Sequence, residues 1–173
     1  MGHRRRRAVA SLLAMVSAVS ALQGCTWQGI SYGCSDRDSA FSSTLADLAI
    51  LAEHPADAES AEAYAGCDPD DGFAYAGRTY RVSFARSGIL AFYRHAAVAD
   101  GWHLDGETPP PPTAGLVVSG SASCYSKQVE GTTAYLAVWF PDDLLVPGAP
   151  APATPYATFG VEVTASHDSG AWC

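Results

Sequence analysis

The chain has 173 residues and carries 10 Lys plus Arg against 18 Asp plus Glu, a formal charge of −8. Removing residues 1–24 deletes four arginines and no acidic residue, so the remaining 149 residues hold six basic against 18 acidic side chains, a formal charge of −12. A surface this acidic repels nucleic acid and anionic lipid headgroups, which argues against nucleic-acid binding and against a polybasic membrane patch. A chain of this length is the usual size of one domain with a real hydrophobic core.

The N-terminal segment has the composition of an export signal. Four consecutive arginines at residues 4–7 precede an apolar run at residues 8–22, which is the order of a charged n-region and an h-region. The run has 15 residues, whereas a helix needs about 20 to cross the hydrocarbon core of a bilayer. We therefore expect residues 1–24 to be a cleaved signal peptide.

Residues 22–25, Leu-Gln-Gly-Cys, resemble the lipobox of bacterial lipoproteins of the actinobacterial type. The resemblance implies that the Cys25 thiol receives diacylglycerol and becomes the new N-terminus, so that the protein is held on the outer face of the cell membrane by a lipid. Gln23 departs from the small or β-branched residue usual at its position. The alternative is ordinary signal-peptidase cleavage after Ala21, with Val19 and Ala21 at the small-residue subsites, which would release a freely secreted protein.

The cysteine count favours lipidation over simple secretion. The chain has five cysteines, Cys25, Cys34, Cys67, Cys124 and Cys173. If Cys25 carries the lipid, an even four remain, and in an oxidising exported setting these predict two disulfides. No Cys-x-x-Cys pair occurs, and the spacings do not suit a zinc site. Of the three possible connectivities we favour Cys67 with Cys124, each beside a predicted strand, and Cys34 with Cys173, which ties the chain ends together.

The first third of the domain has helical patterning. Apolar side chains recur at intervals of three and four across residues 38–53, which predicts an amphipathic helix. Pro55 ends or kinks this helix. The Ala- and Glu-rich residues 56–65 predict a second, short helix that ends before Gly66.

A strand and a further helix are expected next. Residues 79–84 alternate apolar and polar side chains, which predicts a half-buried strand, and residues 73–75 can begin the same strand. Ser87 can cap a helix that runs to about Asp100. Gly101 follows at the position where glycine commonly ends helices.

Three more strands are expected in the C-terminal part. Residues 116–128 and 132–140 flank Val-Glu-Gly at residues 129–131, a spacing that suits a β-hairpin. Residues 156–165 alternate again and predict the last strand.

These elements predict an α+β fold, with an N-terminal helix followed by a small, mainly antiparallel sheet of three or four strands that has helices on one face. We expect residues 36–173 to form this single globular domain. Residues 25–35 are short, Gly-containing and aromatic, and we expect them to be the lipidated tether.

A second resemblance involves the middle of the chain. A helix followed by Gly101 and Trp102, a proline-rich gap at residues 109–112 and a strand bearing Cys124 and Lys127 resembles small exported proteins of high-GC Gram-positive bacteria, whose function is generally unassigned. The resemblance extends over roughly residues 67–140 and implies the fold more than any activity. We favour a packing role for Trp102 over a role in ligand stacking.

The sequence offers no metal site that rises above background. Three aspartates and a glycine at residues 68–72 could supply the oxygen ligands of a calcium loop, but the chain then enters a predicted strand without further ligands, so a solvated turn is favoured. The histidines of the mature chain, His54, His95, His103 and His167, include no pair four residues apart that a helix could offer to one metal ion. We expect no metal and no cofactor.

No catalytic motif is present either. The serine-rich residues 119–123 lack the Gly-x-Ser-x-Gly elbow, and Ser-x-x-Lys and a Gly-rich phosphate loop do not occur. We therefore expect a non-catalytic, lipid-anchored module that binds an envelope partner or a small ligand, or serves as an accessory subunit. The alternative is an envelope hydrolase with dispersed Ser, His and Asp residues, because a triad is recognised by its geometry and not by sequence position.

Overall fold

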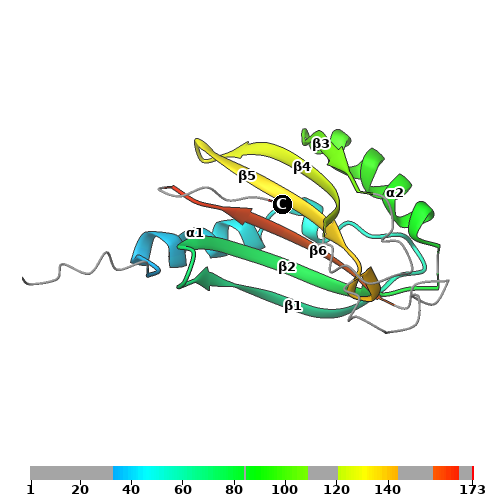
Figure 1. Ribbon diagram of the computed structural model, residues 1–173, viewed down its shortest axis with the longest axis horizontal. Helices are drawn as coiled ribbons and strands as arrows, with labels where there is room; N and C mark the ends of the chain where they lie inside the picture. The colour runs from blue at the N-terminus through cyan, green and yellow to red at the C-terminus, as the bar shows by residue number, and fades with distance from the viewer. Residues whose placement is uncertain (1–32, 84, 109–120, 144–157, 168–172) are drawn as a thin grey trace, which may run out of the picture. The chain divides into compact units, whose positions relative to one another are not determined.

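Two α-helices and a six-stranded antiparallel sheet make up the described part of the chain (Figure 1). The computed structural model describes residues 33–83, 85–108, 121–143, 158–167 and 173, all of them within the compact unit Tyr32–Cys173. In chain order the elements are α1 (Asp36–Ala46), η1 (Ala49–Leu51), β1 (Glu59–Asp68), β2 (Phe73–Arg81), α2 (Arg86–Ala99), β3 (His103–Glu107), β4 (Ser121–Val129), β5 (Thr132–Trp139), η2 (Pro141–Asp143) and β6 (Thr158–Ala165).

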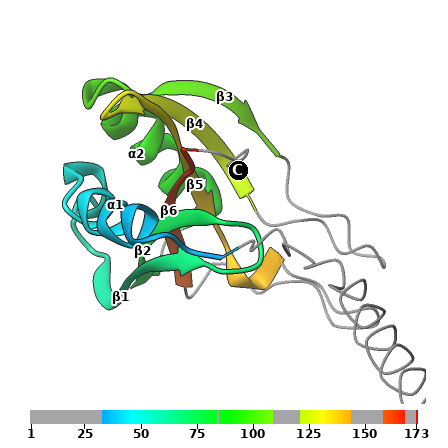
Figure 2. The ribbon, with the colours of Figure 1, turned by 90° about the vertical axis from the view of Figure 1, so that its left-hand side faces the viewer.

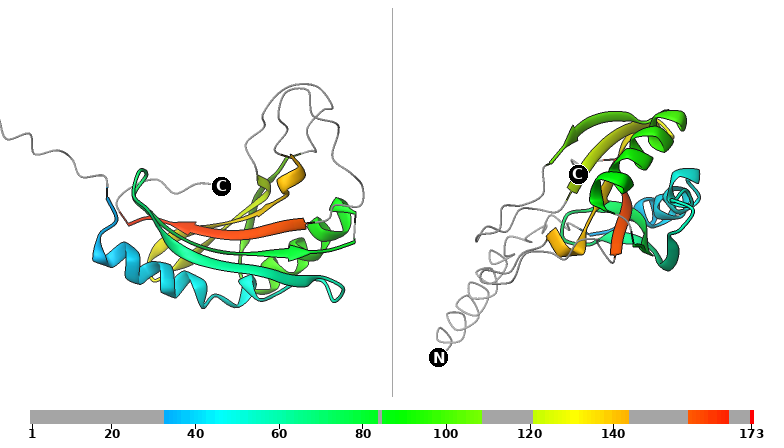
Figure 3. Two further views of the ribbon diagram at one scale, coloured as in Figure 1. Left: turned by 90° about the horizontal axis from the view of Figure 1, so that it is seen from below. Right: turned by 90° about the vertical axis from the view of Figure 1, so that its right-hand side faces the viewer.

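The sheet has the strand order β1-β2-β6-β5-β4-β3, and every neighbouring pair is antiparallel. β6, the last strand in the sequence, therefore lies in the middle of the sheet between β2 and β5. Figures 2 and 3 show that α1 and α2 lie on the same face of this sheet. The predicted α+β class with a mainly antiparallel sheet is confirmed, whereas the predicted three or four strands are too few, because the sheet has six.

The two strands that the sequence prediction missed are the edge strands β1 and β3. The predicted helix over residues 56–65 is wrong, since most of that stretch is β1 and pairs with β2 from Glu59↔Arg81 to Asp68↔Phe73. Ala and Glu favour a helix by only a few tenths of a kcal/mol per residue, roughly, so tertiary pairing can override them. β3 has almost no buried side chain, and it therefore lacks the alternation that identifies a strand.

The predicted helix over residues 38–53 is divided in the structure. α1 ends at Ala46 and Leu48 is extended, with φ −65° and ψ 128°, before the 3₁₀ turn η1. Phe41 and Ile50 are both buried. Ile50 is nine residues after Phe41, and each residue of an α-helix turns the chain by about 100°. In one continuous helix the two side chains would therefore lie on opposite sides. The break after α1 lets both side chains reach the core.

The second helix and the β4–β5 hairpin lie where the sequence predicts them. The predicted cap at Ser87 is wrong, because α2 begins at Arg86 after an N-cap at Ala85, which places Ser87 inside the helix. α2 ends at Ala99, and Gly101 follows the C-cap Asp100 with φ +83°. The Trp102 N–H donates back to the Ala97 carbonyl at 2.9 Å, as in the common glycine-terminated helix end. Glu130 and Gly131 have φ of 48° and 80°, the positive values that a two-residue hairpin turn requires.

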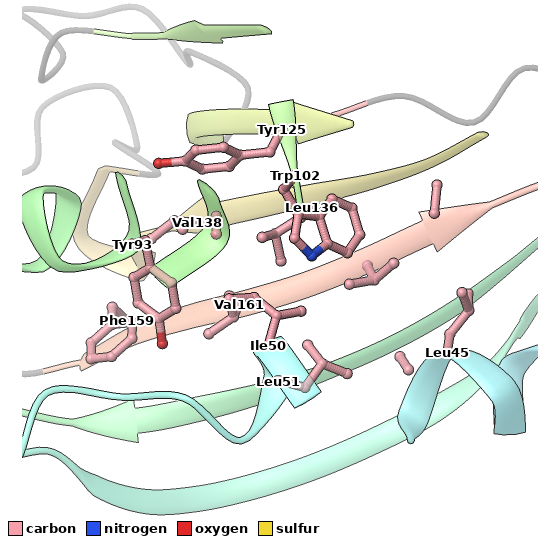
Figure 4. Packing of buried hydrophobic residues seen from close by; sticks show 14 of the residues in the cluster. Leu45, Ile50, Leu51, Tyr93, Trp102, Tyr125, Leu136, Val138, Phe159 and Val161 are labelled. Carbon is pink, nitrogen blue, oxygen red and sulfur yellow. The ribbon is translucent and has the colours of Figure 1, made fainter. Parts of the chain in front are cut away.

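The hydrophobic core lies between the two helices and the sheet face toward them (Figure 4). We call this side the helix face; its fully buried strand residues are Ala74, Ala76, Tyr80, Tyr125, Ala134, Leu136, Val138, Phe159, Val161, Val163 and Ala165. Tyr80 stacks on Phe159 with ring centroids 5.2 Å apart, and Tyr93 of α2 meets the same ring edge-on at 5.9 Å. The Tyr93 and Tyr80 hydroxyls donate to the Glu53 and Leu51 carbonyls, at 2.7 and 2.6 Å. These bonds satisfy the polar ends of buried rings.

Two disulfides are present, Cys34–Cys67 and Cys124–Cys173, with Cα–Cα distances of 5.8 and 5.7 Å. The prediction that these four cysteines form disulfides is supported, but the pairing that we favoured is wrong. Cys67 on β1 and Cys124 on β4 are four strand positions apart in the sheet, which is about 19 Å at ~4.8 Å per strand. A disulfide bridges Cα atoms no more than about 7 Å apart. Cys34 and Ser35, which the sequence assigns to the tether, are thus fastened to the domain.

Candidate functional site

The sheet face opposite the helices carries a group of aromatic side chains. We call it the aromatic face; its rings are Tyr64, Phe73, Tyr75, Tyr135 and Trp139, and all five are half-buried. Three of them lie directly opposite a glycine on the neighbouring strand: Tyr64 opposite Gly77, Tyr75 opposite Gly66, and Trp139 opposite Gly160.

Each of these three rings occupies the space that a side chain on its partner glycine would fill. A Cβ built on Gly77 would lie 2.5 Å from the phenol oxygen of Tyr64. A Cβ on Gly160 would overlap the indole of Trp139. Glycine in a strand often marks such a close approach. The rings therefore lie against the backbone of the sheet instead of standing away from it.

Glu162 lies in the same row of the sheet as Tyr64. The register pairs Tyr64 with Gly77, Gly77 with Glu162, and Glu162 with Ala137. Because Gly77 has no side chain, the Tyr64 ring reaches across β2, and its hydroxyl donates to Glu162 Oε2 at 2.9 Å. The small Ala137 on the other side leaves the carboxylate without a bulky neighbour in this row.

Burial raises the pKa of the Glu162 carboxyl above its ordinary value, and the hydrogen bond from Tyr64 opposes this because it favours the charged form. Burial also raises the pKa of the Tyr64 phenol, and the nearby Glu162 carboxylate raises it further. The neighbouring Trp139 indole acts in the opposite direction and lowers the pKa of the phenol. Tyr64 therefore stays a hydroxyl donor, while the environment of Glu162 disfavours its charge.

Glu162 has no cationic partner among the described residues. The described ion pairs of Arg and Lys join Arg86 to Asp143, Arg94 to Glu107 at 2.8 Å and Lys127 to Asp100 at 3.2 Å. Glu162 Oε2 accepts the Tyr64 hydrogen bond, and Oε1 has no described hydrogen-bond partner. A half-buried carboxylate in this state can hold a proton or accept a cation or hydrogen-bond donor from outside the chain.

The structure also brings together a serine, an aspartate and a histidine, at the start of α1 and the end of β6. Ser35 Oγ donates to Asp38 Oδ2 at 2.6 Å and accepts from the Asp38 N–H at 3.2 Å, which forms a capping box at the N-terminus of α1. The Ser35 bond lowers the pKa of Asp38. His167 lies 3.8 Å from Asp38. In a hydrolase triad the histidine contacts the serine, whereas here the aspartate lies between them. This cluster gives the hydrolase hypothesis no support.

The remaining predicted site residues are dispersed. His95 and His103 are exposed, and His54 is half-buried. Asp68 Oδ1 accepts from the backbone N–H of Asp70 at 2.8 Å and of Asp71 at 3.3 Å, so this carboxylate organises the β1–β2 turn. Within the described ranges, no group of three or more His, Cys, Asp or Glu is arranged to hold a metal ion.

Trp102 is a packing residue on the helix side, only 2 % exposed. Its indole N–H donates to Asp100 at 3.0 Å, and the ammonium of Lys127 lies 5.7 Å from the ring centroid. Cys25 lies outside the described residues.

A second polar centre connects the start of α2 to η2. Arg86 and Asp143 form a buried ion pair, and Arg86 Nη2 also donates to the Thr108 carbonyl at 2.8 Å. The guanidinium lies 4.7 Å from the centre of the Phe140 ring. Both charges of this pair are satisfied within the chain, so we assign it a structural role.

The chain matches no protein-family model, no curated protein and no solved structure. In the part of the chain that the structure describes, neither helix is long and apolar enough to span a bilayer. The candidate site therefore rests on its own geometry.

Sequence reasoning missed Tyr64, Trp139 and Glu162. Tyr64 fell within a predicted helix, so its face was assigned wrongly. The sequence of β6 did contain a signal for this site. Gly160 and Glu162 alternate there with apolar residues, so both lie on the strand face that points away from the core.

Gly160→Ala tests whether the Trp139 ring depends on the glycine beneath it. We expect this variant to lose about 1–3 kcal/mol of unfolding free energy, because the new methyl group displaces the indole, and to change the near-UV circular dichroism. Gly88→Ala is the matched control, since a Cβ there meets nothing within 4 Å, and it should be neutral or slightly stabilising. Equal unfolding midpoints in urea for the two variants would contradict the described packing.

Proposed function

We propose that this protein is a lipid-anchored, non-catalytic binding or accessory module on the outer face of the cell membrane, and that it binds through the aromatic face of its sheet. The observation that carries the binding role is the half-buried Glu162, which has aromatic neighbours and no cation of its own among the described residues. Burying an unpaired charge costs free energy. Such a feature is more readily explained by a ligand than by folding.

Two observations support the exported location. The N-terminal sequence combines an arginine run, a short apolar run and the lipobox-like residues ending in Cys25. Two disulfides lie within the domain, and such bonds persist mainly in oxidising compartments. With Cys25 set aside for the lipid, every other cysteine is paired.

The acidic mature chain agrees with an anchor that is an acyl group and not a charged patch. At a formal charge of −12 for residues 25–173, the domain is repelled by anionic headgroups. The same charge disfavours nucleic acid as a partner and raises the local concentration of cations around the domain.

The anchor is tested by Cys25→Ser in the full chain. We expect the wild-type protein to enter the detergent phase in a phase-separation assay and the variant to remain in the aqueous phase, because the acylated thiol is lost. Cys34→Ser is the control, since it removes a disulfide-bonded cysteine and leaves the lipidation site intact, and it should still enter the detergent phase. If the wild-type protein stays in the aqueous phase, secretion after Ala21 replaces the anchor hypothesis.

The binding surface is tested by photo-crosslinking in cells that produce the full chain. A benzophenone side chain at Arg81, an exposed position on the aromatic face of β2, should give adducts with envelope components, and intact mass spectrometry detects large and small adducts alike. The control position is Val98 on α2, which is 57 % exposed and lies on the opposite side of the sheet. Equal adduct yields at the two positions, or none at Arg81, would contradict binding through the aromatic face.

A further inference from the structure

We propose that Glu162, Tyr64 and Trp139 form a binding site for an organic ammonium group, that is, an amine or quaternary ammonium carried by a small molecule or by an envelope component. This inference rests on the proposed binding function and specifies the chemistry of the ligand. Three properties of the site lead to it: the state of the carboxylate, the placement of the rings and the number of available ligand atoms.

Among the described residues, Glu162 has no counter-charge. Asp143, Glu107 and Asp100 each lie within ion-pairing distance of an arginine or lysine. Glu162 lies on the central strand β6 and is half-buried, whereas Glu107 is exposed. Even so, the described hydrogen-bond partner of Glu162 is a neutral phenol, that of Tyr64. A cation arriving from outside would compensate the cost of a partly desolvated charge.

Two aromatic rings lie close to Glu162 on the aromatic face. Tyr64 and Trp139 each have one face against a glycine of the sheet, Gly77 and Gly160 respectively. In the register, Tyr64 lies in the same row as Glu162, across Gly77, whereas Trp139 lies on β5, two residues along from the Ala137 that faces Glu162. Aromatic faces carry negative electrostatic potential and attract ammonium groups within about 6 Å of the ring centre. A carboxylate beside aromatic faces therefore favours a cation that is also partly apolar.

The available ligand atoms favour an ammonium over a guanidinium or a metal ion. Tyr64 already occupies Oε2, which leaves Oε1 for the ligand. A guanidinium is bound best by both oxygens of a carboxylate. Calcium and the transition metals need several oxygen, nitrogen or sulfur ligands, and the described residues bring no three such side chains together. An ammonium group needs one oxygen and the adjoining ring faces.

A neutral ligand such as a sugar could also stack on these rings, but it would leave the carboxylate uncompensated. The appropriate probes are therefore choline and its neutral isostere 3,3-dimethylbutan-1-ol, which have nearly the same shape and differ in charge. An NMR titration of the full mature domain, followed on the backbone amides of Gly160 and Glu162, reports both the affinity and the location of binding.

We expect choline to bind saturably at millimolar concentration and the neutral isostere to bind at least about tenfold more weakly. Glu162→Gln, which keeps an oxygen that can accept the Tyr64 hydrogen bond, should weaken choline binding by about tenfold or more. Glu59→Gln is the matched control. It removes the same charge from an exposed position at the start of β1 and should leave the affinity unchanged, which separates the site from the general acidity of the domain.

Equal affinities for choline and its isostere, unchanged choline binding in Glu162→Gln, or no saturable binding up to about 20 mM would each overturn the inference. The crosslinking experiment distinguishes this failure from failure of the proposed function. If adducts form at Arg81 and persist when Glu162→Gln is added, the aromatic face binds a ligand that is not a cation. If no adducts form at Arg81, the binding function itself is contradicted.

Discussion

The hydrogen bond between Tyr64 and Glu162 depends on the absence of a side chain between them. Gly77 separates the two residues in the register of the sheet, and a larger residue would stand in the path of the phenol. The helix face of the same strands is filled by the core, so the sheet cannot shift by one residue without exposing that core. The core on one face thus fixes which side chains meet on the other. Gly160 has the same role beneath Trp139.

The two disulfides attach segments from both ends of the domain to this sheet. Cys34–Cys67 ties the start of α1 to the edge strand β1, and Cys124–Cys173 ties the C-terminus to β4. Loops of 33 and 49 residues closed in this way stabilise a fold by about 3–4 kcal/mol each in the chain-entropy account. If Cys25 carries the lipid, the nine residues to Cys34 reach no more than about 30 Å.

The elements that the sequence predicted well are those specified locally. α2 has a regular apolar stripe and is followed by Gly101 just after its C-cap, and the β4–β5 turn has the residues that its backbone requires. Residues 56–65 were misassigned because their preference for a helix is weaker than pairing with β2, which lies later in the sequence. The strand order is likewise set by distant pairing, and without it neither the partner of Cys67 nor the meeting of Tyr64 with Glu162 could be predicted. Both contacts join segments that are far apart in the chain.

The fold holds the Glu162 carboxyl group in surroundings that disfavour its charge, and we propose that a cationic ligand compensates this charge. The most direct test is an NMR titration of the Glu162 carboxyl carbon in the wild-type protein and in Tyr64→Phe. We predict a pKa above the ordinary value of 4.5, and a higher pKa in the variant, because the lost hydrogen bond had favoured the carboxylate. A wild-type pKa at or below 4.5, or no increase in Tyr64→Phe, would contradict the account.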